Sequence, residues 1–167
     1  KTTNKNTEDK FHIDLSSQAL INIPEEIFSK KNLKSLNIST NQITDIPSKI
    51  EQFNSLEKLY IGDNQIKKLP GALSALQILK ELHAQCNQLE SLPTTLSISL
   101  HKLDLSGNAF TYMPDGIRRL KNLRYLNLAD NNLSRLPSWI GQLQQLKILC
   151  LENNKLRDLP ALIEDIV

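Results

Sequence analysis

The sequence has little of what several large classes of protein require. Its 167 residues include only two cysteines and five glycines, and 5% of them are aromatic. Two cysteines offer no disulfide framework, so we expect reducing surroundings. No apolar run approaches the roughly 18 residues of a membrane-spanning helix, and the start KTTNKNTEDK lacks the apolar core of a signal peptide. Membrane insertion is therefore not expected.

The sequence also lacks an excess of charge of one sign. Its 20 basic and 18 acidic residues leave a formal net charge of +2, and the lysines and arginines are scattered along the chain. Proteins that neutralise phosphates gather basic residues on one face or in one run, so nucleic acid is not an expected partner. The chain also begins without methionine, which suggests a fragment or a processed product.

Proline, by contrast, is placed with strict regularity. All seven prolines fall at one phase of a repeat, 23 residues apart except for a single spacing of 21. They are Pro24, Pro47, Pro70, Pro93, Pro114, Pro137 and Pro160. Self-similarity at a fixed period of this length is the mark of a repeat architecture.

Each unit carries the pattern L-x-x-L-x-L-x-x-N-x-L, as in LKSLNISTNQI. The alternating apolar residues, such as Leu36 and Ile38, point to one face of a short strand, which is the core side. An asparagine then follows, and its carboxamide is able to satisfy backbone groups that are left unpaired where the chain turns inward. The sequence thus predicts a stacked ladder formed by Asn41, Asn64, Asn87, Asn108, Asn131 and Asn154.

The segment after each strand predicts a buried return path. Proline fixes its own φ and keeps the preceding residue extended, and the I-x-x-L spacing that follows favours a short helical turn. Since one repeat cannot bury its apolar face alone, the units must stack. We therefore predict an α/β fold, a right-handed solenoid or horseshoe with a curved parallel sheet of about seven strands and short helical or 3-10 turns on its convex side. The 21-residue unit, from Leu79 to Ser99, should pinch the convex side only.

The repeats give the domain organisation. Residues 1–9 form a polar segment that we expect to be disordered or to act as a cap, and residues 10–167 form one repeat domain with seven units. The first unit is degenerate, with Lys10 in place of leucine and Gln18 in place of asparagine. The last unit is either complete or truncated.

The 23-residue unit with LPxxIxxLxx after the strand, seen best in LPSWIGQLQQL, resembles the Ras-suppressor class of leucine-rich repeats, which also occurs in many bacterial repeat proteins. Ala84 and Met113 depart from the pattern without weakening it. The resemblance implies an interaction module that is intracellular or delivered as an effector. The expected location is accordingly the cytoplasm, or a host cytoplasm for a bacterial effector.

The side chains between the core positions of each strand should face solvent on the concave surface, free of the demands of the fold. Binding energy concentrates in aromatic and charged side chains near the centre of such a surface. The predicted partner-binding residues are Lys58, Tyr60, Glu81, His83, Lys102, Asp104, Tyr125 and Asn127. In the alternative reading these are ordinary solvated sheet residues, with Lys58 and Glu81 as a cross-strand pair.

A second concave patch combines Tyr125 with Ile148 and Cys150. We interpret it either as a binding edge or as a surface that a further repeat covers. Self-association through this end of the solenoid is a third expectation.

No catalytic or metal site is expected. His83 and Cys86 form an H-x-x-C pair without two further ligands for zinc, and an open sheet gives a cysteine nucleophile neither oxyanion donors nor a closed pocket. Cys86 and Cys150 are three repeats apart, about 14 Å at the usual strand spacing, which is too far for a disulfide. The sequence therefore predicts neither an enzyme nor a cofactor.

The predicted function is a protein-binding module, or adaptor, that engages a partner protein on its concave sheet. The alternative is the substrate-recognition or autoinhibitory domain of a larger enzyme, such as a ubiquitin ligase effector or a Roco-type GTPase-kinase.

Overall fold

The structure is a computed structural model that describes residues 10–157. The predictions for residues 1–9 and for the end of the seventh repeat, including self-association through that end, lie outside the described residues.

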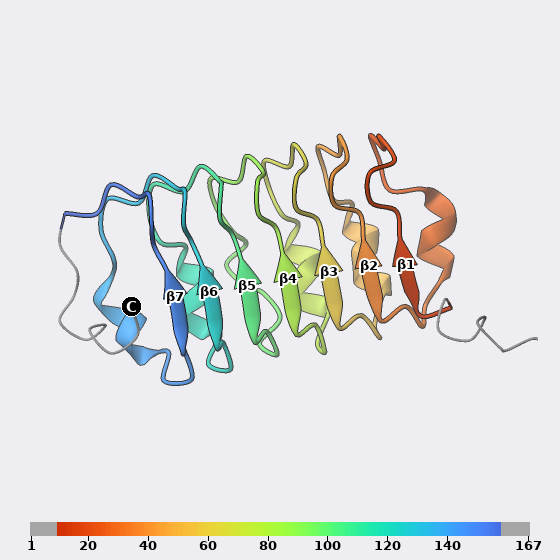
Figure 1. The fold of residues 1–167 in the computed structure, drawn as a ribbon. Coiled ribbons are helices and arrows are strands. Elements are labelled where there is room, and N and C mark those ends of the chain that lie inside the picture. The colour runs from red at the N-terminus through yellow and green to blue at the C-terminus, as the bar shows by residue number, and fades with distance from the viewer. Residues whose placement is uncertain (1–9, 158–167) are drawn as a thin grey trace, which may run out of the picture.

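Seven parallel strands form one curved sheet in chain order, each pairing with the next (Figure 1). They are β1 (His12–Asp14), β2 (Ser35–Asn37), β3 (Lys58–Tyr60), β4 (Glu81–His83), β5 (Lys102–Asp104), β6 (Tyr125–Asn127) and β7 (Ile148–Cys150). The central residue of each strand from β2 to β7 is buried, while its two neighbours face the opposite side. The strands pair without offset, so that Leu36 lies beside Leu59. The predicted parallel sheet with one strand per unit is confirmed.

The asparagine ladder closes each turn after the strand. Asn64 shows the geometry: its Oδ1 accepts from the backbone N–H of Ile43 at 2.9 Å. Its Nδ2 donates to the carbonyls of Ile38, Ile61 and Gly62 at 3.0 to 3.1 Å. The other ladder asparagines repeat these contacts, each joining its own turn to the preceding repeat. The ladder that the sequence predicts is therefore present and supplies partners for backbone groups that the turn leaves unpaired.

The residue before each ladder asparagine has a left-handed backbone, and so does Ser17, which precedes Gln18 in the first unit. The φ angles of Ser17, Thr40, Asp63, Cys86, Gly107, Asp130 and Asn153 lie between 51° and 62°. Only one of the seven is glycine, although other residues adopt this conformation at a cost of about 1–3 kcal/mol. The bonds of the neighbouring asparagine hold the turn in place, and they offset that cost.

Within the described part of the chain, five 3-10 helices lie behind the sheet, on the convex side (Figure 1). They are η1 (Glu25–Ser29), η2 (Ser48–Gln52), η3 (Gly71–Ala75), η4 (Asp115–Arg119) and η5 (Ser138–Gln142). Each starts directly after a proline, and each carries one buried Ile or Leu at its third position into the core. Every helix among residues 10–157 is five residues long, far too short and polar to cross a membrane.

The 21-residue unit differs from its neighbours on the convex side alone. Its strands β4 and β5 keep their pairing, with Leu82 beside Leu103. No 3-10 helix follows Pro93, however, whereas each of the other prolines among the described residues is followed by one. In the next unit, Gly116 of η4 lies so close that an added Cβ would stand 2.5 Å from the carbonyl oxygen of Pro93. The shortened return path thus lacks a helical turn and lies close to the backbone of the next unit at Gly116.

Candidate binding surface

The eight predicted binding residues come from four adjacent strands. β3 supplies Lys58 and Tyr60, β4 supplies Glu81 and His83, β5 supplies Lys102 and Asp104, and β6 supplies Tyr125 and Asn127. All eight are half-buried and lie opposite the buried centre of their strand. Because the pairing has no offset, they form two continuous rows across the sheet. The structure therefore brings the whole predicted set together on the concave side.

An aromatic stack lies at the centre of this surface. The rings of Tyr60 and His83 are 4.7 Å apart between centroids and 24° from parallel. Offset stacks of this kind are favourable beyond the burial of their area, and a partner need not order the two side chains on binding. The stack is therefore a pre-formed platform for an apolar or planar group.

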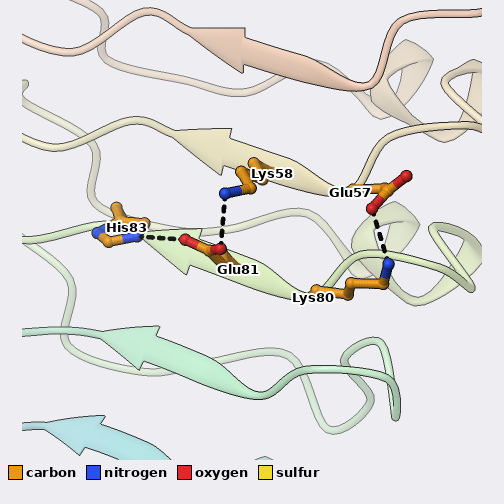
Figure 2. Close-up of polar contacts among 5 residues, drawn as sticks. All are labelled: Glu57, Lys58, Lys80, Glu81 and His83. Atoms are coloured by element: carbon orange, nitrogen blue, oxygen red, sulfur yellow. Dashed lines mark hydrogen bonds and ion pairs between the residues drawn. The ribbon is translucent and has the colours of Figure 1, made fainter.

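A chain of polar contacts holds the stack from one side. The Lys58 ammonium lies 2.9 Å from one carboxylate oxygen of Glu81, and His83 Nε2 lies 3.3 Å from the other (Figure 2). Burial acts to raise the pKa of the Glu81 carboxyl, but the hydrogen bonds from Lys58 and His83 together outweigh it and lower that pKa. The Lys58 pKa is raised, first by its hydrogen bond to Glu81. At neutral pH the surface between β3 and β4 thus carries its own counter-charges.

A second ion pair at the edge of the same strands was not among the predicted site residues. Glu57 and Lys80 precede β3 and β4, and their charged atoms are 2.7 Å apart (Figure 2). The hydrogen bond from Lys80 is the first cause of the lowered Glu57 pKa. The signal was present in the sequence, because opposite charges 23 residues apart at one phase of the repeat must become neighbours.

The predicted residues of β5 and β6 contact each other differently. The Lys102 ammonium lies over the ring of Tyr125, 5.1 Å from its centroid, and Asn127 donates to Asp104 at 3.4 Å. Burial, followed by the nearby Cys150 and Asp104, raises the pKa of the Tyr125 hydroxyl. That hydroxyl consequently stays protonated at neutral pH and remains available as a hydrogen-bond donor.

One expectation about these rows is wrong in part. We expect the outward positions to be free of the demands of the fold, yet Asp104 Oδ1 accepts from both the backbone N–H and the hydroxyl of Ser106. Asn127 similarly accepts from the N–H of Ala129 at 3.0 Å. Short polar side chains make such bonds to the backbone two residues on and stabilise a turn. These two residues therefore help to end their strands, so they are weaker candidates for recognition than the stack.

Cys86, three residues beyond His83 in the sequence, is poorly suited to be a nucleophile. Burial is the first cause of its raised thiol pKa, and the carboxylates of Asp63, Asp104 and Asp130 raise it further. Attack requires the thiolate, which this surrounding of negative charge disfavours. The arrangement offers contact area and hydrogen bonds rather than a reactive group.

Comparison with known proteins agrees with this geometry. The family model described as Leucine rich repeat matches residues 12–66, 31–89 and 98–159. A solved leucine-rich-repeat protein from Leptospira interrogans is similar over 96% of the chain, with 27% sequence identity and a TM-score of 0.86. The chain spans about half of that protein, 47% of its length. Among curated proteins none matches significantly. The repeat pattern, the ladder and the family model together show that this chain belongs to the leucine-rich-repeat family.

Proposed function

We propose that the chain is a protein-binding module whose concave sheet engages a partner protein, with Tyr60 and His83 at the centre of the contact. Leucine-rich-repeat domains generally mediate protein–protein interaction and are typically non-enzymatic scaffolds. The concave side chains suit that role because few of them are committed to the core. We assign no reaction and no cofactor to the chain.

The single observation that carries the proposal is the pre-formed Tyr60–His83 stack at the centre of the concave face. Anchors at interface centres are enriched in aromatic residues, and binding is tightest where they are already held in place. One carboxylate oxygen of Glu81 contacts the His83 ring, and the other contacts the Lys58 ammonium, which holds Glu81 in place. Truncating the stack should therefore remove binding energy without changing the fold.

The test compares two doubly substituted chains with the wild type. Tyr60→Ala with His83→Ala removes the stack, whereas Glu51→Ala with Gln52→Ala alters exposed residues of the convex helix η2. A partner is first captured and identified with the wild-type chain, and its Kd for all three is then measured by titration. We expect the concave variant to bind about 30-fold more weakly, as for loss of an interface hot spot, and the convex variant to bind normally.

Equal affinity of all three chains would refute the proposed hot spot. A partner that responds only to the convex substitutions would refute the concave surface as a whole. Thermal unfolding of both variants at the wild-type temperature is required, so that weaker binding is not a consequence of unfolding.

The proposal also includes a reducing, intracellular location, either in the producing cell or in a host. Both cysteines are free thiols, and three strand spacings separate Cys86 from Cys150 in the sheet. Neither contributes a disulfide to the stability of the solenoid.

A further inference from the structure

The edge of the sheet at which the strands begin carries a single row of residues, one directly before each strand from β2 to β7. The backbone joins neighbours in this row: the N–H of Lys147 donates to the carbonyl of Arg124, and the N–H of Arg124 donates to the carbonyl of His101. Neighbours are therefore about 4.8 Å apart. The row consists of Lys34, Glu57, Lys80, His101, Arg124 and Lys147.

The charges in the two halves of this row are arranged differently. In the first half the signs alternate, and Glu57 forms an ion pair with Lys80 at 2.7 Å (Figure 2). In the second half Arg124 lies between His101 and Lys147, with no carboxylate in the row. All four ion pairs among residues 10–157 lie in the units before this half. Like charges side by side across a sheet repel each other, so a position that is neutralised in one half has no counter-charge from the described residues in the other.

Further basic residues lie close to this second half. Residues 116–151 include six basic residues and one acidic residue, Asp130. Asp130 lies beyond the carboxyl end of β6, at the opposite edge of the sheet. Arg118 and Arg119 end η4, Lys121 follows two residues later, and all three are exposed. The balanced charge of the whole chain thus conceals a local excess of positive charge.

A hollow of about 450 Å³ opens at the same edge. It is lined by residues of η5 and of the segments that lead to β6 and β7: Lys121, Gly141, Gln142, Gln144 and Gln145. The Lys121 ammonium donates to the carbonyl oxygen of Gln142 at 3.4 Å. Ammonium and glutamine amide groups are hydrogen-bond donors, so the lining suits a carboxylate. We call Lys121, Arg124 and Lys147, together with this hollow, the basic edge.

We propose that the basic edge binds an acidic segment of the partner protein, in addition to the contact on the concave sheet. This proposal rests on the proposed function, because it names the chemistry of a second part of the same partner. The row from His101 to Lys147 spans two strand spacings, about 10 Å, which about three residues of an extended segment cover. One acidic side chain of such a segment meets Arg124 and Lys147, and another enters the hollow beside Lys121.

The shape of the edge favours a polypeptide over other polyanions. A lipid bilayer or a nucleic-acid duplex meets the protruding ends of basic side chains over a wide area, whereas the hollow admits a narrow group such as one acidic side chain. Ile98 is 65% exposed, and its carbonyl accepts from Asn122, the residue after Lys121, at 3.1 Å. An acidic segment that includes an apolar residue matches this combination. Because the concave sheet already holds the partner, even a weak contact at the edge acts at high effective concentration.

The test variant copies an arrangement that the chain already has. Arg124→Glu places a carboxylate beside Lys147, as Glu57 lies beside Lys80. It removes positive charge from the basic edge while it gives the row an ion pair, so we expect it to unfold at the wild-type temperature or above. Lys68→Glu is the matched control, because it makes the same change of net charge at an exposed residue beyond the carboxyl end of β3.

Binding is measured with three labelled probes: a peptide of three Glu-Glu-Leu repeats, a single-stranded oligonucleotide of similar charge, and vesicles that contain phosphatidylserine. We expect the wild type to bind the peptide, and to bind it more tightly than the other two probes. Arg124→Glu should bind the peptide at least about tenfold more weakly, and Lys68→Glu should bind it within about twofold of the wild type. The difference between the two variants should shrink as salt screens the edge.

Equal affinity of Arg124→Glu and Lys68→Glu for the peptide would overturn the proposal, and so would a wild-type chain that does not bind it. Tighter binding of the oligonucleotide or of the vesicles would also overturn it, and would assign the edge to nucleic acid or to a membrane surface. The chain with Tyr60→Ala and His83→Ala should bind the peptide as the wild type does. Loss of partner binding in that chain therefore tests the central stack, whereas the peptide tests the basic edge alone.

Discussion

The two sides of each strand follow different rules. On the buried side the residue hardly varies: Leu36, Leu59, Leu82, Leu103 and Leu126 occupy one column at 0% exposure, and the ladder asparagines form another. On the concave side, the column that starts at Asp14 continues with Asn37, Tyr60, His83, Asp104, Asn127 and Cys150. The contrast teaches that the repeats need the same buried residues in order to stack. The concave positions accept varied side chains, including those that form the turn at the end of a strand.

Energetics explains this contrast. A buried leucine cut to alanine costs about 2–5 kcal/mol, since it loses apolar contact and leaves a cavity. Exposed substitutions away from special contacts usually change stability by less than about 0.5 kcal/mol. Substitutions on the two sides of one strand should therefore differ several-fold in their effect on the free energy of unfolding.

The largest difference in the free energy of unfolding is expected between alanine substitutions of two asparagines in neighbouring units. Asn64→Ala removes a buried ladder amide and leaves the N–H of Ile43 without a partner. The carbonyls of Ile38 and Ile61 each lose one of two side-chain donors. At about 1–3 kcal/mol for the buried N–H left unpaired and about 0.5–1.5 kcal/mol for each of the other hydrogen bonds lost, we expect the free energy of unfolding to fall by about 3 kcal/mol or more. Asn37→Ala on the concave side loses only bonds to Ser39 and should cost about 1 kcal/mol or less.

Urea unfolding followed by circular dichroism measures both values. A fall of similar size in the two variants would mean that the ladder is no more important than a surface turn, and the contrast between the two sides would be lost. The other ladder positions provide repeats of the measurement, because each makes the same set of bonds.

A smaller effect on stability is expected from substitutions on the convex side, where two glycines have different surroundings. Gly116→Ala places a Cβ 2.5 Å from the carbonyl oxygen of Pro93, whereas Gly71→Ala meets nothing within 4 Å. Overpacking of a buried site costs about 1–3 kcal/mol, so we expect Gly116→Ala to destabilise the chain by that amount. Gly71→Ala should leave stability unchanged or raise it by about 0.4–1 kcal/mol, since alanine reduces the entropy of the unfolded chain.

The measurement is the unfolding midpoint of each variant against the wild type. Equal tolerance of the two substitutions would indicate that η4 does not pack tightly on the 21-residue unit. Restoring the two missing residues after Pro93 should relieve the clash if the shortened return path causes it.

The features that recur in almost every repeat are the ones that the sequence predicts correctly. The strand positions, the ladder and the proline-led helical turns each recur in almost every unit, so that a single sequence contains its own alignment. The left-handed residues before the ladder were missed, because Ser17, Thr40, Asp63 and Cys86 share no side-chain chemistry. Their shared left-handed φ angle follows from the geometry of the turn and not from their side chains.

The candidate site is predicted less completely. Pairing without offset is enough to place Tyr60 beside His83 and Lys58 beside Glu81, and the structure has both pairs. The turn-forming bonds of Asp104 and Asn127 were missed because they depend on side-chain rotation, which periodicity does not record. Each candidate recognition residue occurs in one repeat only, so comparison of the repeats with one another gives no information about its role.

The smallest effect is expected from the ion pair between Lys58 and Glu81, which tests whether the concave side adds anything to stability. The side chains are 45% and 26% exposed, and pairs of this kind contribute about 0.2–1 kcal/mol. A double-mutant cycle with Lys58→Met and Glu81→Gln should find a coupling within that range at pH 7. The exposed pair Lys49 and Glu25, with side chains 52% and 75% exposed, should couple more weakly.

The coupling should also depend on pH in a defined direction. The folded chain lowers the Glu81 pKa from its ordinary 4.5, so the pair contributes fully above that pH and loses its contribution as the pH falls through the lowered value. The Lys58 pKa is raised from 10.5, so on the alkaline side the coupling persists beyond the ordinary lysine range. Repeating the cycle across acid pH measures this loss. A coupling that survived full protonation of Glu81 would come from packing and not from charge, and the concave side would then contribute to the fold much as the buried side does.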